Sequence, residues 1–113
     1  MIKFWKEDFK YIGKKYISCN SYMNRYECYT FSVRGESANY LINKYDLDYP
    51  NIQVHLFACD NTMTVTSKTD NRLNSDVADI EDEDLKELIS IIQEDVDYFK
   101  DMLELGETYE INR

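Results

Sequence analysis

The chain has 113 residues, of which 43% are hydrophobic and 31% are charged, and its formal net charge is −9 at pH 7. This length and composition are typical of one globular domain and exclude a disordered chain. Three cysteines without a C-x-x-C spacing argue against a disulfide framework and a zinc knuckle, and no apolar run reaches the length of a membrane span.

The charge is divided unevenly along the chain. Residues 1–57 carry a net charge of +2, residues 58–113 carry −11, and 14 acidic residues lie between Asp76 and Glu110. A protein that binds nucleic acid directly normally has the opposite sign, because it must neutralise phosphates. We therefore expect no direct nucleic-acid binding and no membrane binding. The unpaired thiols, the charged N-terminus and the abundance of residues with AT-rich codons predict a cytoplasmic protein of a bacterial host cell.

The first predicted element is a short amphipathic helix over residues 2–12. Apolar residues recur at helical spacing, and lysines form a second stripe with the same spacing: Ile2, Trp5, Phe9, Ile12 and Tyr16, then Lys3, Lys6, Lys10 and Lys14. Gly13 is placed as a helix stop. We interpret the lysine stripe as a solvated face, because Glu7 and Asp8 interrupt the basic character that a membrane-surface helix needs.

A β-hairpin is predicted next, with strands near residues 15–20 and 26–34. The side chains expected to face the core alternate with polar residues along the second strand: Tyr29, Phe31 and Val33. Gly35 ends this strand. A helix follows near residues 37–46, with Ser37 as a possible N-cap.

Residues 52–66 predict a second hairpin with a tight turn at Asp60 and Asn61. The two faces of its first strand are Ile52, Val54, Leu56 and Ala58 on one side, and Gln53, His55, Phe57 and Cys59 on the other. Residues 69–79 are polar and predict a loop. The last helix is expected over residues 80–105, with Gly106 at its C-cap.

The predicted order is therefore α-β-β-α-β-β-α, in a single α+β domain over residues 1–113. Two hairpins most simply merge into one four-stranded antiparallel sheet, with the long C-terminal helix packed across it. The sequence "TYEIN", residues 108–112, is a possible short edge strand. The predicted core consists of Phe31, Val33, Val54, Leu56, Leu85, Ile89, Ile92, Val96 and Phe99.

No motif in the sequence is specific for catalysis. His55 is the only histidine, and on a strand it would lie about 13 Å from Cys59, too far for a nucleophile–base pair. Cys19 or Cys28 could approach His55 across strands, but a structural histidine is the simpler interpretation. We expect no catalytic residue and no cofactor, and we keep a small enzyme that uses only Asp and Glu as an alternative.

The carboxylate run from Glu81 to Asp84 does not fit a calcium-binding loop. An EF-hand that began at Asp76 would place Ala78 and Ile80 at ligand positions and would lack its central glycine. We therefore expect no dedicated metal site.

Tyrosines are concentrated in the first half of the chain. Eight of the ten lie before residue 50: Tyr11, Tyr16, Tyr22, Tyr26, Tyr29, Tyr40, Tyr45 and Tyr49. Tyrosine is suited to interfaces, because its ring is rigid and apolar and its tip is polar. It is also common in strands, so half-buried sheet positions are the simpler interpretation.

The apolar side of the C-terminal helix is broad. Its residues at spacings of three and four are Leu85, Ile89, Ile92, Val96, Phe99 and Leu103, and five more widen the stripe: Leu88, Ile91, Tyr98, Met102 and Leu105. A helix that lies on one sheet needs a narrower stripe. We expect burial on two sides, either by the sheet and the N-terminal helix or by a second subunit in a homodimer.

The opposite side of this helix is acidic. The residues that we predict to bind a partner are Glu83, Glu87, Glu94, Asp97, Asp101 and Glu104, together with the neighbouring Tyr98. The six carboxylates are about 6 Å apart along the helix axis, too sparse by themselves to copy the phosphates of a DNA strand. A solvated face is the simpler interpretation. Against it, like charges at i,i+4 destabilise an isolated helix, and this self-repulsion favours the interpretation that the negative field itself is used.

The profile as a whole, small, acidic, tyrosine-rich and without an active-site motif, resembles phage-encoded inhibitors of host enzymes, including anti-CRISPR and DNA-mimic proteins. These proteins share a profile and not a motif, so the resemblance assigns no residue a role. It implies a non-enzymatic binding protein that occupies the basic, nucleic-acid-binding groove of a host protein such as a CRISPR effector. The alternative is a small bacterial immunity or regulatory protein that caps a cognate toxin with the same acidic residues.

Overall fold

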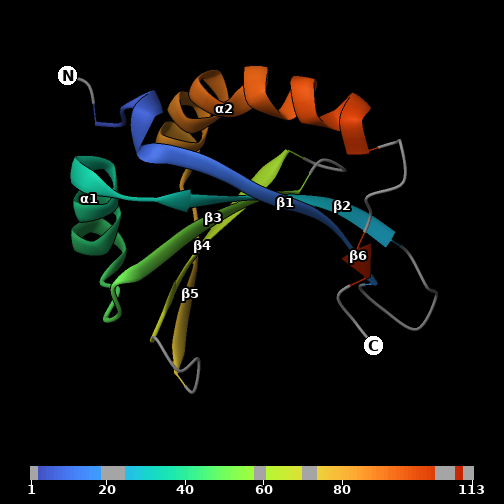
Figure 1. The fold of residues 1–113 in the computed structure, drawn as a ribbon. Coiled ribbons are helices and arrows are strands. Elements are labelled where there is room, and N and C mark those ends of the chain that lie inside the picture. Colours follow the sequence, from blue (N-terminus) through green and yellow to red (C-terminus); the bar gives the residue numbers. More distant parts are fainter. Residues whose placement is uncertain (1–2, 19–24, 58–60, 70–73, 104–108, 111–113) are drawn as a thin grey trace.

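The computed structural model describes residues 3–18, 25–57, 61–69, 74–103 and 109–110, with side chains described for residues 3–13, 28–57, 61–69 and 74–98. The elements in chain order are η1 (Lys6–Asp8), β1 (Phe9–Ser18), β2 (Arg25–Val33), α1 (Gly35–Tyr45), β3 (Asn51–Phe57), β4 (Thr62–Lys68), β5 (Ser75–Asp79), α2 (Asp82–Leu103) and β6 (Tyr109–Glu110). In Figure 1, α2 crosses above the sheet, and α1 lies beside the end at which β2 finishes and β3 begins.

All strands belong to one sheet, in the order β5-β4-β3-β2-β1-β6. Strands β1 to β5 are antiparallel to their neighbours, whereas β6 pairs with β1 in parallel through two residue pairs. The predicted α+β class and both predicted hairpins are confirmed. The prediction of four strands in the order α-β-β-α-β-β-α is wrong, because the described residues form five antiparallel strands, with β5 between β4 and α2 in the chain and a strand in place of the first helix.

The predicted helix over residues 2–12 is wrong: this segment forms the short 3-10 turn η1 and the start of β1. Phe9 is buried, Lys10 is exposed and Tyr11 is half-buried, which is the alternation of a strand. The register of β1 against β2 then shifts between Tyr11 and Gly13, as at a β-bulge. The extra residue, Ile12, is three positions from Phe9 and so imitates helical spacing in the sequence.

The fifth strand, β5, lies where a polar loop was predicted over residues 69–79. Its sequence, SDVAD, holds a single strongly β-favouring residue, Val77, between two aspartates. Its position comes from pairing with β4, including hydrogen bonds at both ends: Thr69 N donates to Asn74 O at 3.2 Å, and Ile80 N donates to Met63 O at 3.0 Å. A strand that is stabilised mainly by pairing with its neighbour shows little strand pattern in its own sequence, and for this reason β5 was predicted as a loop.

The two principal helices lie close to their predicted positions. The range 80–105 was expected for α2 (Asp82–Leu103) and 37–46 for α1 (Gly35–Tyr45). Two smaller predictions are also confirmed: β6 is the expected edge strand within residues 108–112, and Asn61 has a φ of 55°, as a tight turn requires. None of the described helices has an apolar stretch long enough to cross a membrane.

The N-terminus of α1 is capped from outside the helix. Ser37, the predicted N-cap, is buried inside the first turn, and the carboxylate of Asp8 accepts hydrogen bonds from its N–H at 3.1 Å and its hydroxyl at 2.8 Å. Gly35 has a φ of 66°, and a Cβ there would lie 2.7 Å from a carboxylate oxygen of Asp8. This close approach and the positive φ explain why the first residue of α1 is glycine. The expectation that Ser37 caps α1 is therefore wrong.

One face of the sheet, the inner face, packs against both helices. Of the predicted core residues, six are buried there: Phe31, Val33, Val54, Leu56, Ile92 and Val96. Leu85 and Ile89 are partly buried against the same core, and the side chain of Phe99 lies outside those described. The core also takes in Phe4, Leu41, Met63, Val65 and Leu88.

The outer face of the sheet carries the alternate side chains, among them Ser32, Gln53, His55, Thr64 and Thr66. The predicted alternation along β3 is confirmed: Ile52, Val54 and Leu56 are buried, whereas Gln53, His55 and Phe57 are half-buried. Ala58 and Cys59 lie outside the described residues. On α2, Leu85, Ile89 and Ile91 are packed within the chain, and a homodimer stays a prediction.

The Ile92 side chain is 1% exposed at the centre of the helix–sheet interface. We expect Ile92→Ala to lower the free energy of unfolding by about 2–5 kcal/mol, because it removes buried methyl groups and leaves a cavity. Val77→Ala is the matched control, since Val77 is 66% exposed and should change stability by about 0.5 kcal/mol or less. Urea denaturation measures both, and equal small losses would show that the α2 face is not buried.

Candidate functional site

The exposed side of α2 carries four of the predicted partner-binding residues. Glu83, Glu94, Asp97 and Tyr98 are exposed, and Tyr98 reaches 64% exposure. Glu87 is half-buried. Two further predictions, the side chains of Asp101 and Glu104, lie outside those described.

Three of these carboxylates have lysine partners from other parts of the chain. Lys44 of α1 lies 2.7 Å from Glu83, and Lys6 of η1 lies 3.3 Å from Glu94. The backbone N–H of Lys3 donates to Glu87 at 3.2 Å, and the ammonium nitrogen of Lys3 is 3.8 Å from the same carboxylate.

These contacts relieve the repulsion between Glu83 and Glu87, which lie four residues apart on the helix. The self-repulsion that favoured a functional acidic face is therefore partly compensated within the chain. Asp97 is bound differently: it accepts a hydrogen bond from the amide of Gln93 at 2.8 Å.

The α2 side remains acidic after this compensation. Eight acidic residues lie between Glu81 and Asp97, against Lys86 as the one base in that stretch. Lys3, Lys6 and Lys44 add three positive charges through their ion pairs. Eight negative charges against four positive ones leave four uncompensated, and Tyr98 is exposed at the edge of this acidic surface.

Beside this surface lies a carboxylate that sequence reasoning treated as one more surface charge. Asp84, in the first turn of α2, is 0% exposed. One of its oxygens accepts hydrogen bonds from the Lys3 ammonium at 2.7 Å and the Tyr40 hydroxyl at 3.0 Å. The other accepts from the Tyr45 hydroxyl at 2.8 Å and lies 2.9 Å from the Lys44 ammonium. We call these five residues the Asp84 network.

Neighbouring groups extend the network. The Tyr45 oxygen also accepts the backbone N–H of Glu81 at 3.0 Å, which fixes the start of α2. The Lys44 ammonium contacts Glu81 at 3.2 Å as well as Glu83. Both lysines lie over the Tyr40 ring, Lys3 at 5.3 Å and Lys44 at 5.9 Å from its centre.

The network holds its groups in fixed protonation states. Burial alone would raise the pKa of the Asp84 carboxyl, but hydrogen bonds from Lys3, Lys44, Tyr45 and Tyr40 outweigh it and lower the pKa to about 2. Hydrogen bonds to Glu83 and Asp84 raise the pKa of Lys44. Burial is the main cause that raises the pKa of Tyr45 to about 12. A carboxylate with four donors and so low a pKa is built to stay ionised, not to exchange protons as a general acid.

The sequence does contain a signal for Asp84. It lies four residues before Leu88 and eight before Ile92, so helical spacing places it on the buried side of α2. What the sequence does not show is that Lys3, 81 residues earlier, and α1 would meet it there. Two of the tyrosines, Tyr40 and Tyr45, serve this internal network.

His55 is bonded on both sides across the outer face. Its Nδ1 lies 2.9 Å from the Thr30 hydroxyl and its Nε2 lies 2.9 Å from the Thr66 hydroxyl. Cys28 is a buried cysteine whose sulfur is 3.9 Å from the same Thr30 hydroxyl. These contacts fit the structural interpretation of His55. Among the residues that the structure describes, no group of three His, Cys, Asp or Glu side chains is arranged to hold a metal ion.

Comparison with protein-family models, with curated proteins and with solved structures found no significant match to this chain.

Asp84→Asn should destabilise the protein by about 3 kcal/mol at neutral pH, because it leaves Lys3 and Lys44 without their buried counter-charge. Glu94→Gln is the matched control, since this substitution breaks an exposed ion pair with Lys6, which contributes about 0–1 kcal/mol. Urea unfolding of both variants measures the difference. Similar small losses would show that the buried carboxylate is not a structural anchor.

The contribution of Asp84 should also depend on pH. Its pKa is about 2 in the folded protein and about 3.9 in the unfolded chain, so its stabilisation is fully present above about pH 4 and is lost as the pH falls toward 2. We therefore expect the stability gap between the native protein and Asp84→Asn to narrow over this window. A gap that stays constant in urea titrations from about pH 5 to pH 2 would contradict the assignment.

Proposed function

We propose that this chain is a non-enzymatic binding protein whose acidic α2 surface occupies the basic groove of a nucleic-acid-handling protein, as a phage-type inhibitor of a host enzyme would. The observation that carries the proposal is the uncompensated charge beside Asp97 and Tyr98. Four negative charges remain on the α2 side after Lys86 and the ion pairs with Lys3, Lys6 and Lys44 are counted, and the exposed ring of Tyr98 lies at their edge.

Charge and aromatic surface would have separate roles in such a complex. The negative field speeds association with a basic groove, because long-range attraction raises the rate of encounter. Tyr98 supplies rigid contact area with a polar tip, and such contacts slow dissociation. Lys6 and Lys44 are engaged by Glu94 and Glu83 and so oppose a basic partner less than free lysines would.

The absence of catalysis is part of the proposal. Asp84 is saturated with donors and held ionised, and both ring nitrogens of His55 face threonine hydroxyls. Neither group, as placed, is available to activate a substrate.

The test is affinity capture from a bacterial lysate with the double variant Glu94→Lys and Asp97→Lys. Both side chains are exposed, so the fold should survive, whereas reversal of half-buried Glu87 would disturb its bond to Lys3. We expect the native chain to capture nucleic-acid-binding proteins and the double variant to lose them. The matched control is Glu36→Lys with Asp48→Lys, which changes the net charge equally at exposed sites away from α2.

Salt and nucleic acid give two further readouts on the captured complex. Raising the salt from about 50 to about 500 mM shortens the Debye length from about 14 to about 4 Å and should weaken binding markedly. Added DNA should compete for the groove of the partner. If the α2 variant captured the same proteins as the control variant, the acidic face would be only a solvated surface.

A further inference from the structure

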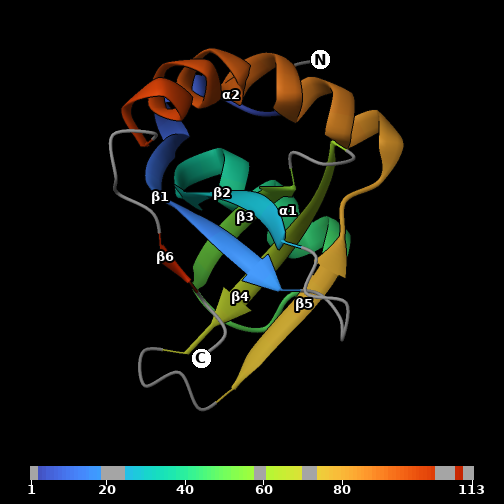
Figure 2. The ribbon, with the colours of Figure 1, turned by 90° about the vertical axis from the view of Figure 1, so that its right-hand side faces the viewer.

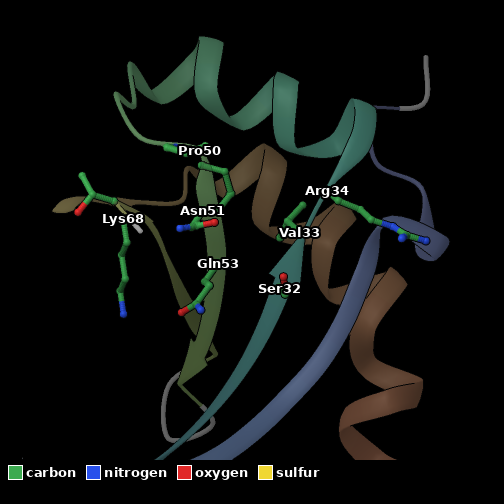
Figure 3. A pocket seen from close by; sticks show the side chains of 9 residues that line it. Ser32, Val33, Arg34, Pro50, Asn51, Gln53 and Lys68 are labelled. Atoms are coloured by element: carbon green, nitrogen blue, oxygen red, sulfur yellow. The ribbon is translucent and has the colours of Figure 1, made fainter. Parts of the chain in front are cut away.

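A groove lies on the outer face of the sheet, at the end where β2 finishes and β3 begins. It encloses about 440 Å³, and its polar lining is Ser32, Arg34, Asn51, Gln53, Lys68 and Thr69. A second depression continues beyond Ser32 and Arg34 to Glu7, Asp8 and Lys10. Figure 3 shows Lys68 and Arg34 at opposite ends of the groove, with Gln53 and Ser32 between them and α2 behind the strands.

The register of the strands explains why these side chains share one face. Lys10 of β1 pairs with Ser32 of β2, and Ser32 pairs with Gln53 of β3. On the next strand, Lys68 of β4 pairs with Asn51, two residues before Gln53 on the same face. Three interstrand spacings of about 4.8 Å and an offset of two residues along the strands, about 7 Å, separate the backbones of Lys10 and Lys68 by about 16 Å. Two long cationic side chains thus flank a neutral hydrogen-bonding centre.

The charge of this groove is unlike that of the rest of the chain. Lys3, Lys6 and Lys44 all make ion pairs with α2. In contrast, the three groove cations form no ion pair with any residue of the described part: Lys10, Arg34 and Lys68. In a chain with 22 acidic and 13 basic residues, such a concentration of unpaired positive charge is unexpected.

Two acidic residues border the groove and do not cancel this charge. The Asp8 carboxylate is directed to the N-terminus of α1, where it accepts two hydrogen bonds from Ser37. Glu7 is exposed at the margin. Three cations against these two carboxylates leave the groove net positive.

We propose that this groove binds a small molecule with two oxyanion groups, phosphate or carboxylate. One group is held by Lys68 with the Gln53 amide, and the other by Lys10 and Arg34, with the Ser32 hydroxyl between them. Ammonium and guanidinium groups donate charge-assisted hydrogen bonds to such oxygens, and the neutral amide and hydroxyl fix orientation. This proposal is independent of the proposed function, because the groove and the α2 surface lie on opposite sides of the sheet.

Size and net charge favour a small ligand over a polymer. The enclosed volume of about 440 Å³ lies in the range of small-molecule clefts. A nucleic acid would extend beyond the groove over a protein with a net charge of −9, where its phosphates are repelled. A ligand with two anionic groups keeps all of its charge within reach of the three cations.

The test is a titration of the full chain, at about 50 mM salt so that screening is weak, with three probes: inorganic phosphate, a sugar bisphosphate and adipate. Backbone amide NMR shifts at Ser32, Gln53 and Lys68 locate binding, and calorimetry measures affinity. We expect at least one two-headed probe to bind at these residues and to bind more tightly than inorganic phosphate. Preference for the bisphosphate identifies a phosphate ligand, and preference for adipate a carboxylate ligand.

Single substitutions separate this site from general electrostatic attraction. Lys68→Gln should weaken binding about tenfold, the loss of one charge-assisted contact. Lys86→Gln, the matched control, removes the same charge from the exposed side of α2 and should change binding by less than about twofold. Ser32→Ala leaves every charge in place but removes a hydroxyl that donates to the ligand. It should therefore still weaken the binding of whichever two-headed probe binds more tightly.

Three results would overturn the proposal. The first is the absence of shifts at the groove with every probe, in a chain that the NMR spectrum shows to be folded. The second is equal weakening by Lys68→Gln and Lys86→Gln, which would indicate only net-charge attraction. The third is tighter binding of a single-stranded oligonucleotide than of any small anion at the same residues.

Discussion

The arrangement of this protein depends on one buried negative charge. An ionised carboxylate without partners is very costly inside a protein, so Asp84 requires donors on both of its oxygens. The donors come from two segments that are distant in the chain: Lys3 precedes the sheet, while Tyr40, Lys44 and Tyr45 belong to α1. Satisfying one side chain therefore fixes the N-terminal segment and α1 against the first turn of α2. These contacts hold α2 in its position across the sheet (Figures 1 and 2), and the position of the helix determines the direction of its acidic side.

The same requirement divides the basic residues between two surfaces. Lys3 and Lys44 are drawn to Asp84, and Lys44 and Lys6 then compensate Glu83 and Glu94 at the rim. The acidic surface consequently carries less charge than its composition indicates. Lys10, Arg34 and Lys68, on the other side of the sheet, form no ion pair with the acidic side chains that the structure describes on α2. Positive charge is therefore concentrated in the groove.

Sequence patterns predicted the elements whose own residues determine them. The alternation of Phe31 and Val33 with polar neighbours, and the spacing of Ile92 and Val96, identified a sheet face and a helix face correctly. Patterns failed where a partner decides the structure. The five residues of β5 are a strand because β4 pairs with them, and Asp84 is an anchor because Lys3 reaches it across 81 positions. In the acidic site, exposure of Glu83, Glu94 and Asp97 followed from helical period, but their lysine partners depended on the tertiary fold.

The misread N-terminus connects these observations. Read as a helix, residues 2–12 place Lys3, Lys6 and Lys10 in one solvated stripe. In the folded chain the helical period does not apply: Lys3 and Lys6 precede the strand and turn to α2, whereas Lys10 lies on β1 between Phe9 and Tyr11. Because Phe9 and Tyr11 must face the core, the two-residue period of a strand sends Lys10 to the outer face. Because β1 begins at Phe9, Lys3 pairs with the buried Asp84, Lys6 pairs with Glu94 at the edge of the acidic surface, and Lys10 lies in the groove. Lysines that form a single stripe in the sequence therefore contribute to both sides of the sheet.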